Sequence, residues 1–283
     1  MAIGTWLLGL IMGTALAASP APPPERITYG AAPSQFGELW LPQTREKPPV
    51  VVLIHGGCWQ RAYGLGLMDP LATDLRTHGV AVWNIEYRRL GEAAGGYPGT
   101  FADVAAALDA LRGLAARYPI DAGRVAVVGH SAGGHLALWA AARSRLPADS
   151  VLRTRDPLPV GFVVTLAGIN DLAAYHQRGP ACGGAATIAA LIGVRQRGPA
   201  AYADTSPRAL LPIGVQQLVV SGDDDGIVPM AFGHEYAAAA QTAGDKITEL
   251  VLPGADHFAL IDAKTSGWAA VRQHLLGFLF DRN

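Results

Sequence analysis

The sequence predicts an α/β fold in which a mostly parallel central sheet is covered on both faces by helices. Short runs of β-branched and other apolar residues alternate along the chain with longer segments of helical periodicity. Of the 283 residues, 50% are hydrophobic, which is enough to bury a sheet on both sides. We find no internal repeat, and therefore expect a single domain over residues 25–283.

Six apolar runs are expected to form the parallel strands. The clearest is 50–54, a run of Val-Val-Val-Leu-Ile between Pro-Pro and His-Gly-Gly. The other five are 80–85, 125–128, 160–166, 218–220 and 247–252. Two earlier pieces, around 27–29 and 36–41, predict an antiparallel hairpin at one edge of the sheet.

Helical segments lie between these strands. The segment 101–118 is the clearest, because its apolar residues recur at the spacing of one helix face. The remaining helices are expected over 67–77, 131–143, 232–243 and 268–280.

One connection is much longer than the about 2 to 6 residues that usually join elements of such folds. It runs over residues 168–214 and contains only a short helical patch near 185–192. Connections of this length are usually functional, so we expect this segment to roof a pocket over the active site.

The first residues are expected to be an export signal that is not part of the fold. The apolar run 3–17 is shorter than the about 20 residues that cross a bilayer as a helix. It ends in Ala-Leu-Ala, with small residues at the two positions that a signal peptidase reads. We predict a signal peptide over 1–17, a stiff Pro-rich leader over 18–24, and a periplasmic or secreted mature protein without stable membrane insertion; an uncleaved membrane anchor is the alternative.

Composition argues against several kinds of partner. The formal net charge is -1 and only 16% of the residues are charged, so no basic face for nucleic acid is expected. No cluster of metal-ligand residues stands out, and we expect neither a metal nor another cofactor. The sequence gives no indication of the oligomeric state.

Two cysteines, Cys58 and Cys182, fit an exported protein with one disulfide. Closing so long a loop stabilises a fold by about 4 to 5 kcal/mol when the effect is ascribed to the entropy of the unfolded chain. Two buried free thiols are the alternative.

The sequence Gly-His-Ser-Ala-Gly at 129–133 matches the pattern G-x-S-x-G. It lies where the strand 125–128 gives way to a helix, which is where a sharp turn can expose a nucleophilic serine. The pattern therefore predicts Ser131 as the nucleophile, and the alternative is an ordinary glycine turn.

A serine hydroxyl needs a base to take its proton. His257 follows the last strand, 247–252, at the position that a base occupies in such a fold. His135 is four residues past Ser131 on the same helix, where packing is the better interpretation. The alternative for His257 is an ordinary loop residue.

Three consecutive aspartates, Asp223, Asp224 and Asp225, follow the strand 218–220. Asp225 precedes Ile-Val-Pro, where the chain turns into the next helix, and we predict that its carboxylate orients the imidazole of His257. Asp223 and Asp224 remain alternatives. A cation site is a further interpretation, but no other ligand cluster supports it.

The stretch His-Gly-Gly-Cys-Trp at 55–59 follows the first central strand. Adjacent glycines allow backbone N–H groups to turn toward a developing oxyanion. We predict donors at the N–H groups of Gly57 and Ala132, with Cys58 as a possible third. Trp59 is predicted to line the substrate pocket, with core packing as the alternative.

All of these elements follow strands, and the carboxyl ends of parallel strands meet at one edge of a sheet. The order along the chain is serine, aspartate, histidine, which is typical of this fold and differs from the orders in chymotrypsin and subtilisin. This joint agreement predicts a serine hydrolase more firmly than any one motif does.

With these residues established, the chain resembles the α/β-hydrolase superfamily over nearly all of the expected mature sequence. The motifs at 55–59 and 129–135 resemble small esterases of the acetyl-esterase and kynurenine-formamidase groups. Asn-Ile-Glu-Tyr-Arg-Arg at 84–89 and Gly-Gly-Tyr-Pro-Gly-Thr at 95–100 also resemble bacterial carboxylesterases and prolyl-oligopeptidase-like hydrolases. The resemblance implies hydrolysis of a small carboxylic ester, with catalytic roles for Ser131, Asp225 and His257.

Three rival functions stay open at this point. An arylformamidase or amidase is one, although Cys58 and the export signal depart from the usual cytosolic formamidase pattern. A prolyl peptidase would carry a large gating domain for which this sequence has no room. A catalytically silent scaffold is the third, and the presence of nucleophile, base, acid and oxyanion glycines argues against it.

Overall fold

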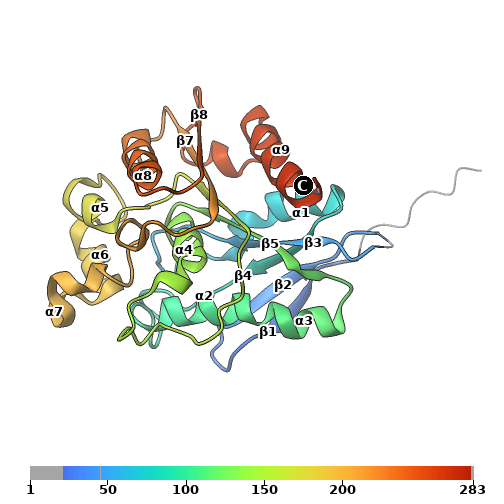
Figure 1. The fold of residues 1–283 in the computed structure, drawn as a ribbon, viewed down its shortest axis with the longest axis horizontal. Helices are drawn as coiled ribbons and strands as arrows, with labels where there is room; N and C mark the ends of the chain where they lie inside the picture. The colour runs from blue at the N-terminus through green and yellow to red at the C-terminus, as the bar shows by residue number, and fades with distance from the viewer. Residues whose placement is uncertain (1–21, 45, 282–283) are drawn as a thin grey trace, which may run out of the picture.

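The computed structural model describes residues 22–44 and 46–281, and the expected signal peptide lies outside these residues. Within this part of the chain, strands form one sheet in the order β1-β2-β4-β3-β5-β6-β7-β8 (Figure 1). The strands are β1 Glu25–Thr28, β2 Phe36–Trp40, β3 Pro49–Ile54, β4 Ala81–Ile85, β5 Asp121–His130, β6 Phe162–Leu166, β7 Gln216–Gly222 and β8 Ile247–Leu252. β3 to β8 pair in parallel, whereas β1 and β2 form the antiparallel edge. The predicted α/β-hydrolase fold, with its edge hairpin, is confirmed.

Helices cover both faces of this sheet. Figure 1 shows α1 and α9 on one side of the sheet and α2 with α3 on the other. The helices outside the long connection are α1 Asp69–Thr77, α2 Gly99–Asp109, α3 Leu111–Arg117, α4 Ala132–Ala141, α8 Met230–Thr242 and α9 Ser266–Phe280. The single helix expected over 101–118 is two helices that meet at Ala110, whose own backbone stays in the right-handed helical region, so the break is local.

The central strands are buried on both faces because helices pack on each. All six residues of β3 are buried, and so are all five of β4 and of β6. Continuous apolar strands of this kind are what a covered parallel sheet requires. No helix among the described residues is both long and apolar enough to cross a bilayer.

The long connection between β6 and β7 carries three α-helices: α5 Leu172–Arg178, α6 Gly184–Ile192 and α7 Val194–Arg197. They gather at one end of the sheet (Figure 1). The connection is fastened to loops that follow three strands. A disulfide joins Cys182 to Cys58 after β3. The Leu191 carbonyl accepts a hydrogen bond from the N–H of Tyr97 at 2.7 Å, and the Tyr175 hydroxyl donates to the Ile227 carbonyl at 2.8 Å. The connection therefore lies across the edge where the parallel strands end.

The Cys58–Cys182 disulfide is expected to contribute substantially to stability. Its half-cystines are 124 residues apart, so the crosslink restricts a long loop of the unfolded chain. Reduction, or the double change Cys58→Ser with Cys182→Ser, should lower the free energy of unfolding by about 4 to 5 kcal/mol. Urea unfolding with and without a reductant measures this. The double variant is the control, because a reductant should not change its midpoint. A loss below about 1 kcal/mol would contradict the expectation.

Candidate active site

Ser131 occupies a sharp turn between β5 and α4. Its backbone has φ 55° and ψ -120°, a conformation that a residue with a side chain rarely adopts. Gly129 and Gly133 flank this turn at positions where a side chain would not fit. A Cβ on Gly129 would overlap the carbonyl of Gly133, and a Cβ on Gly133 would overlap the carbonyl of Ile54. The helix therefore begins one residue later than expected, at Ala132, and the side chain of Ser131 stands at the strand's end.

His257 lies in the loop after β8, and its partner is Asp225. The His257 Nδ1 is 2.7 Å from the Asp225 Oδ2, and both side chains are buried, each residue being 5% exposed. The other oxygen of Asp225 accepts hydrogen bonds from the N–H groups of Ile227 and Val228, each at 2.8 Å. This carboxylate is therefore fixed, and it holds the Nδ1–H tautomer, which leaves Nε2 of His257 able to accept a proton.

The other two aspartates do not reach His257. The Asp223 Oδ1 accepts a hydrogen bond from the N–H of Gly254 at 2.6 Å, and Asp224 is exposed. Among the described residues no three His, Cys, Asp or Glu side chains are grouped so that they could hold a metal ion.

His130 connects His257 to Ser131, a link that the sequence analysis missed. Its Nε2–H donates to the carbonyl of His257 at 2.9 Å, and the two imidazole rings lie 4.5 Å apart between centroids. Since His130 directly precedes Ser131, this hydrogen bond anchors the loop of His257 beside Ser131. The only sequence signal was a histidine at a variable position of G-x-S-x-G.

The segment 55–59 after β3 packs against Ser131. A Cβ on Gly56 would lie 3.0 Å from the Cβ of Ser131 and 2.9 Å from the carbonyl oxygen of His130, so only glycine fits. The N–H groups of Gly57, Cys58 and Ala132 donate to no acceptor within residues 22–44 and 46–281. These amides are thus unused next to the nucleophile, which is what stabilisation of an oxyanion requires.

The structure does not support Trp59 as a wall of the substrate pocket. The side chain is 0% exposed, and its ring packs edge-on against the ring of His135 at 5.4 Å. Its carbonyl accepts a hydrogen bond from the N–H of Leu90 at 2.8 Å, which turns the residue inward. Trp59 therefore packs in the core, as the alternative interpretation has it.

Two exposed aromatic rings border the catalytic residues instead. Phe258 is 54% exposed and contacts the ring of His257 edge-on at 5.4 Å. Tyr63 is 47% exposed and lies so close to Gly57 that a Cβ there would overlap its side chain. By contrast Ser131 is 1% exposed, so these two rings are much more accessible than the serine. Phe258 could have been noticed as the residue after the base, whereas nothing in the sequence singles out Tyr63.

Two buried histidines near the site are uncharged. Burial lowers the pKa of His130 to about 3, helped by the neighbouring His257, and lowers the pKa of His135 to about 4. The Nε2–H of His135 donates to the carbonyl of Thr205 at 2.8 Å, so this histidine packs, as expected.

Comparison with known proteins identifies a family and several esterases that resemble this chain. The profile of the BD-FAE family matches residues 38–239. Carboxylesterase NlhH of Mycobacterium tuberculosis is 40% identical over 101 residues, which are 34% of this chain and 30% of that protein. Esterase LipC of the same species is 26% identical over 256 residues, which are 86% of this chain and 61% of that protein. The matches thus span less than two thirds of either relative.

Solved structures share the fold. A truncated carbohydrate esterase from gut microbiota superposes with a TM-score of 0.77 at 24% identity, over 93% of this chain and 97% of that one. Esterase B from Lactobacillus rhamnosis superposes with a TM-score of 0.75 at 21% identity, over 90% of this chain and 84% of that one.

Because His130 and His135 are uncharged in the folded protein, acid lowers the stability of the fold. Below their ordinary pKa of 6.5 both bind a proton in the unfolded chain, whereas in the folded protein they bind one only near pH 3 and 4. Unfolding therefore takes up protons between pH 6.5 and about 4, and the free energy of unfolding falls as the pH falls through this window. The loss is about 1.4 kcal/mol per histidine per pH unit.

Urea unfolding at several pH values measures this slope. His135→Gln should make the slope shallower, because glutamine does not titrate and can still donate to Thr205. His274→Gln is the control, since His274 is exposed on α9. An unchanged slope in His135→Gln would refute the assignment of a neutral buried imidazole.

Proposed function

Because the chain belongs to the BD-FAE family, we propose that it is a serine hydrolase that cleaves carboxylic esters through Ser131, His257 and Asp225. One observation carries the proposal. The His257–Asp225 pair, with its 2.7 Å contact, is anchored to the residue that precedes Ser131 in a strained turn. The esterases among the relatives support the same reaction.

The reaction proceeds in two steps. The Ser131 Oγ attacks the ester carbonyl while Nε2 of His257 takes the hydroxyl proton. The negative charge on the carbonyl oxygen is stabilised by the N–H groups of Gly57 and Ala132, with Cys58 beside them. The C–O bond then breaks, and the alcohol leaves with the proton from His257. Water, deprotonated by His257, then attacks the acyl-enzyme, and the bond from the acyl carbon to the Ser131 Oγ breaks. His257 returns the proton to this oxygen, and the acid is released.

Asp225 assists both steps because its carboxylate stabilises the imidazolium of His257 that forms in each. Its two backbone hydrogen bonds hold the carboxylate in place before the charge appears on His257. Since His257 returns its proton to the leaving alcohol, the alcohol part of the substrate leaves beside Phe258. An apolar or ring-bearing alcohol would bury part of that exposed ring.

We also propose that the chain is exported and that the connection 168–214 forms a roof over the substrate. The Cys58–Cys182 disulfide fits an oxidising compartment and fastens this connection to the oxyanion segment. The signal peptide over 1–17 and the leader over 18–24 belong to the same proposal.

Removing the nucleophile should abolish turnover. Ser131→Ala is expected to lower kcat for a short-chain nitrophenyl ester by at least about 10⁴-fold because the attacking oxygen is lost. Asp225→Asn should lower kcat by a similar order, because His257 is then held in the wrong tautomer and its imidazolium is not stabilised. Initial rates on purified protein, with circular dichroism to verify folding, measure this. Asp223→Asn is the matched control, since Asp223 is exposed and should leave kcat within about 2-fold.

A fluorophosphonate probe separates an enzyme from a silent scaffold. The probe should label Ser131 in the wild-type protein and leave Ser131→Ala unlabelled. An unlabelled wild-type protein, or undiminished turnover by Ser131→Ala, would rule out the catalytic role.

The ester preference can be tested against the formamidase alternative. We expect kcat/KM for an aryl acetate to exceed that for an aryl formamide by at least about 10-fold. The reason is that an amide nitrogen is a poorer leaving group than an aryl oxygen, so the formamide depends more on protonation by His257. Both rates should be measured at one pH on one preparation. A faster formamide reaction would reassign the substrate while leaving the catalytic residues in place.

A further inference from the structure

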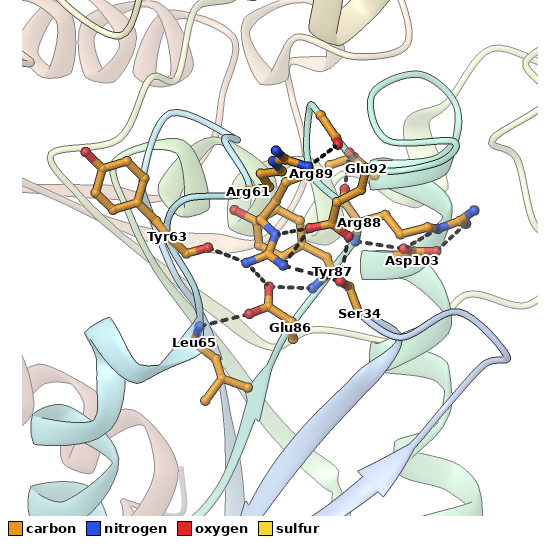
Figure 2. A network of polar contacts seen from close by, with 12 residues as sticks. Ser34, Arg61, Tyr63, Leu65, Glu86, Tyr87, Arg88, Arg89, Glu92 and Asp103 are labelled. Atoms are coloured by element: carbon orange, nitrogen blue, oxygen red, sulfur yellow. Dashed lines mark hydrogen bonds and ion pairs between the residues drawn. The ribbon is translucent and has the colours of Figure 1, made fainter.

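A buried polar network contacts His55 of the segment 55–59, and Glu86 is at its centre (Figure 2). Glu86 follows β4 and is 5% exposed. Its Oε1 is 2.7 Å from the Nε2 of His55, 3.0 Å from the N–H of Tyr87 and 3.1 Å from Arg89. Its Oε2 accepts a hydrogen bond from the N–H of Leu65 at 3.1 Å. The network thus ties the loop after β3 to the end of β4.

Glu86 is ionised in this setting. The groups around it, namely two backbone N–H groups and Arg89, can only donate, so its oxygens act as acceptors. Burial alone would raise the pKa of Glu86, but the hydrogen bond from His55 and the charges of His55 and Arg89 outweigh it and hold the pKa below its usual value. Arg89 is held in turn by Glu92 at 2.6 Å and donates to the carbonyl of Tyr63.

Both ring nitrogens of His55 therefore carry hydrogen. Nε2 faces the Glu86 carboxylate, and Nδ1 faces the carbonyl oxygen of Gly56 at 2.7 Å. A carboxylate and a carbonyl can only accept, so each nitrogen must donate. The ring that makes these two contacts is 0% exposed and stacks on Tyr87 at 4.5 Å.

The hydrogen bond to Gly56 fixes the direction of the next amide. In a planar trans peptide, the C=O of one residue and the N–H of the next point in opposite directions. The Gly56 carbonyl is drawn toward His55, so the N–H of Gly57 points away from it. The Tyr87 hydroxyl donates to the His55 carbonyl at 3.0 Å, which restrains the preceding peptide as well. Gly56 is also the residue that touches Ser131.

We propose that His55, kept as an imidazolium by the Glu86 carboxylate that Arg89 pairs with, is a positioning residue that aims the N–H of Gly57 at the oxyanion. The inference rests on the proposed ester hydrolysis and deepens it. It predicts that the network acts on the transition state, in which the oxyanion forms, and hardly at all on the bound ester.

The chain contains a matched control for this network. Arg88, next to Arg89, pairs with the fully buried Asp103 at 2.6 Å. Asp103 also accepts a hydrogen bond from Gln35 at 2.6 Å. In Figure 2 this pair lies to the right of Glu86, whereas Tyr63 and Leu65 lie to its left. Asp103→Asn thus removes a buried carboxylate from the same neighbourhood without removing a contact to the oxyanion segment.

The test compares Glu86→Gln, His55→Asn and Asp103→Asn with wild type on a nitrophenyl ester. We expect Glu86→Gln and His55→Asn to lower kcat by about 10- to 100-fold with KM changed by less than about 3-fold. The inhibition constant of a trifluoromethyl ketone, which forms an oxyanion with the serine, should rise by the factor by which kcat/KM falls. Asp103→Asn should lower the melting temperature but keep kcat within about 2-fold.

A second measurement does not depend on whether the variants fold. In nitrogen-15 spectra of wild-type protein labelled at histidine, both ring nitrogens of His55 should be protonated at pH 7.5. An unprotonated His55 nitrogen overturns the proposal, and so does a folded Glu86→Gln with wild-type kcat and inhibitor affinity. An equal loss of kcat in Asp103→Asn also overturns it. Failure of the fluorophosphonate to label wild-type Ser131 would instead overturn the proposed function.

Discussion

The parallel pairing of β3 with β5 is the constraint on which the site depends. The register sets Ile54 beside Gly129, so the loops that follow the two strands leave the sheet at the same level. One loop holds Gly56 and the other Ser131, and they meet with no room for a side chain between them. The strained backbone of Ser131 is maintained because this contact, the sheet and α4 surround it.

Two buried imidazole–carboxylate pairs lie on either side of this contact, each with an N···O distance of 2.7 Å. The two pairs differ in the partner of the other ring nitrogen, which is Nε2 in His257 and Nδ1 in His55. In His257 it is free of a partner among the described residues, which suits a group that must exchange a proton. In His55 it faces a carbonyl, which suits a group that stays protonated. Since burying such pairs costs about as much free energy as it returns, we interpret both as serving function more than stability.

The long connection shows how segments distant in sequence become one unit at this edge. Its ties reach the loops after β3, β4 and β7, and a further hydrogen bond runs from Trp139 on α4 to the carbonyl of Asp204 at 2.9 Å. Ordering a segment of this length costs conformational entropy. Without such ties, the free energy gained from its contacts would not offset that cost. The disulfide ends at Cys58, so the long connection and the segment 55–59 are covalently coupled.

The sequence by itself determined the fold class. It also identified Ser131, Asp225 and His257 as candidates, in that order along the chain. Apolar runs and G-x-S-x-G are local signals, and in a parallel sheet the residues after each strand must share one edge. It left open which of three aspartates meets His257, and it placed Trp59 at the pocket. Only the tertiary structure decided these points, because they depend on which backbone amides and rings come within contact distance. The same holds for His130, Glu86 and Arg89, whose roles arise from partners that are distant in the chain.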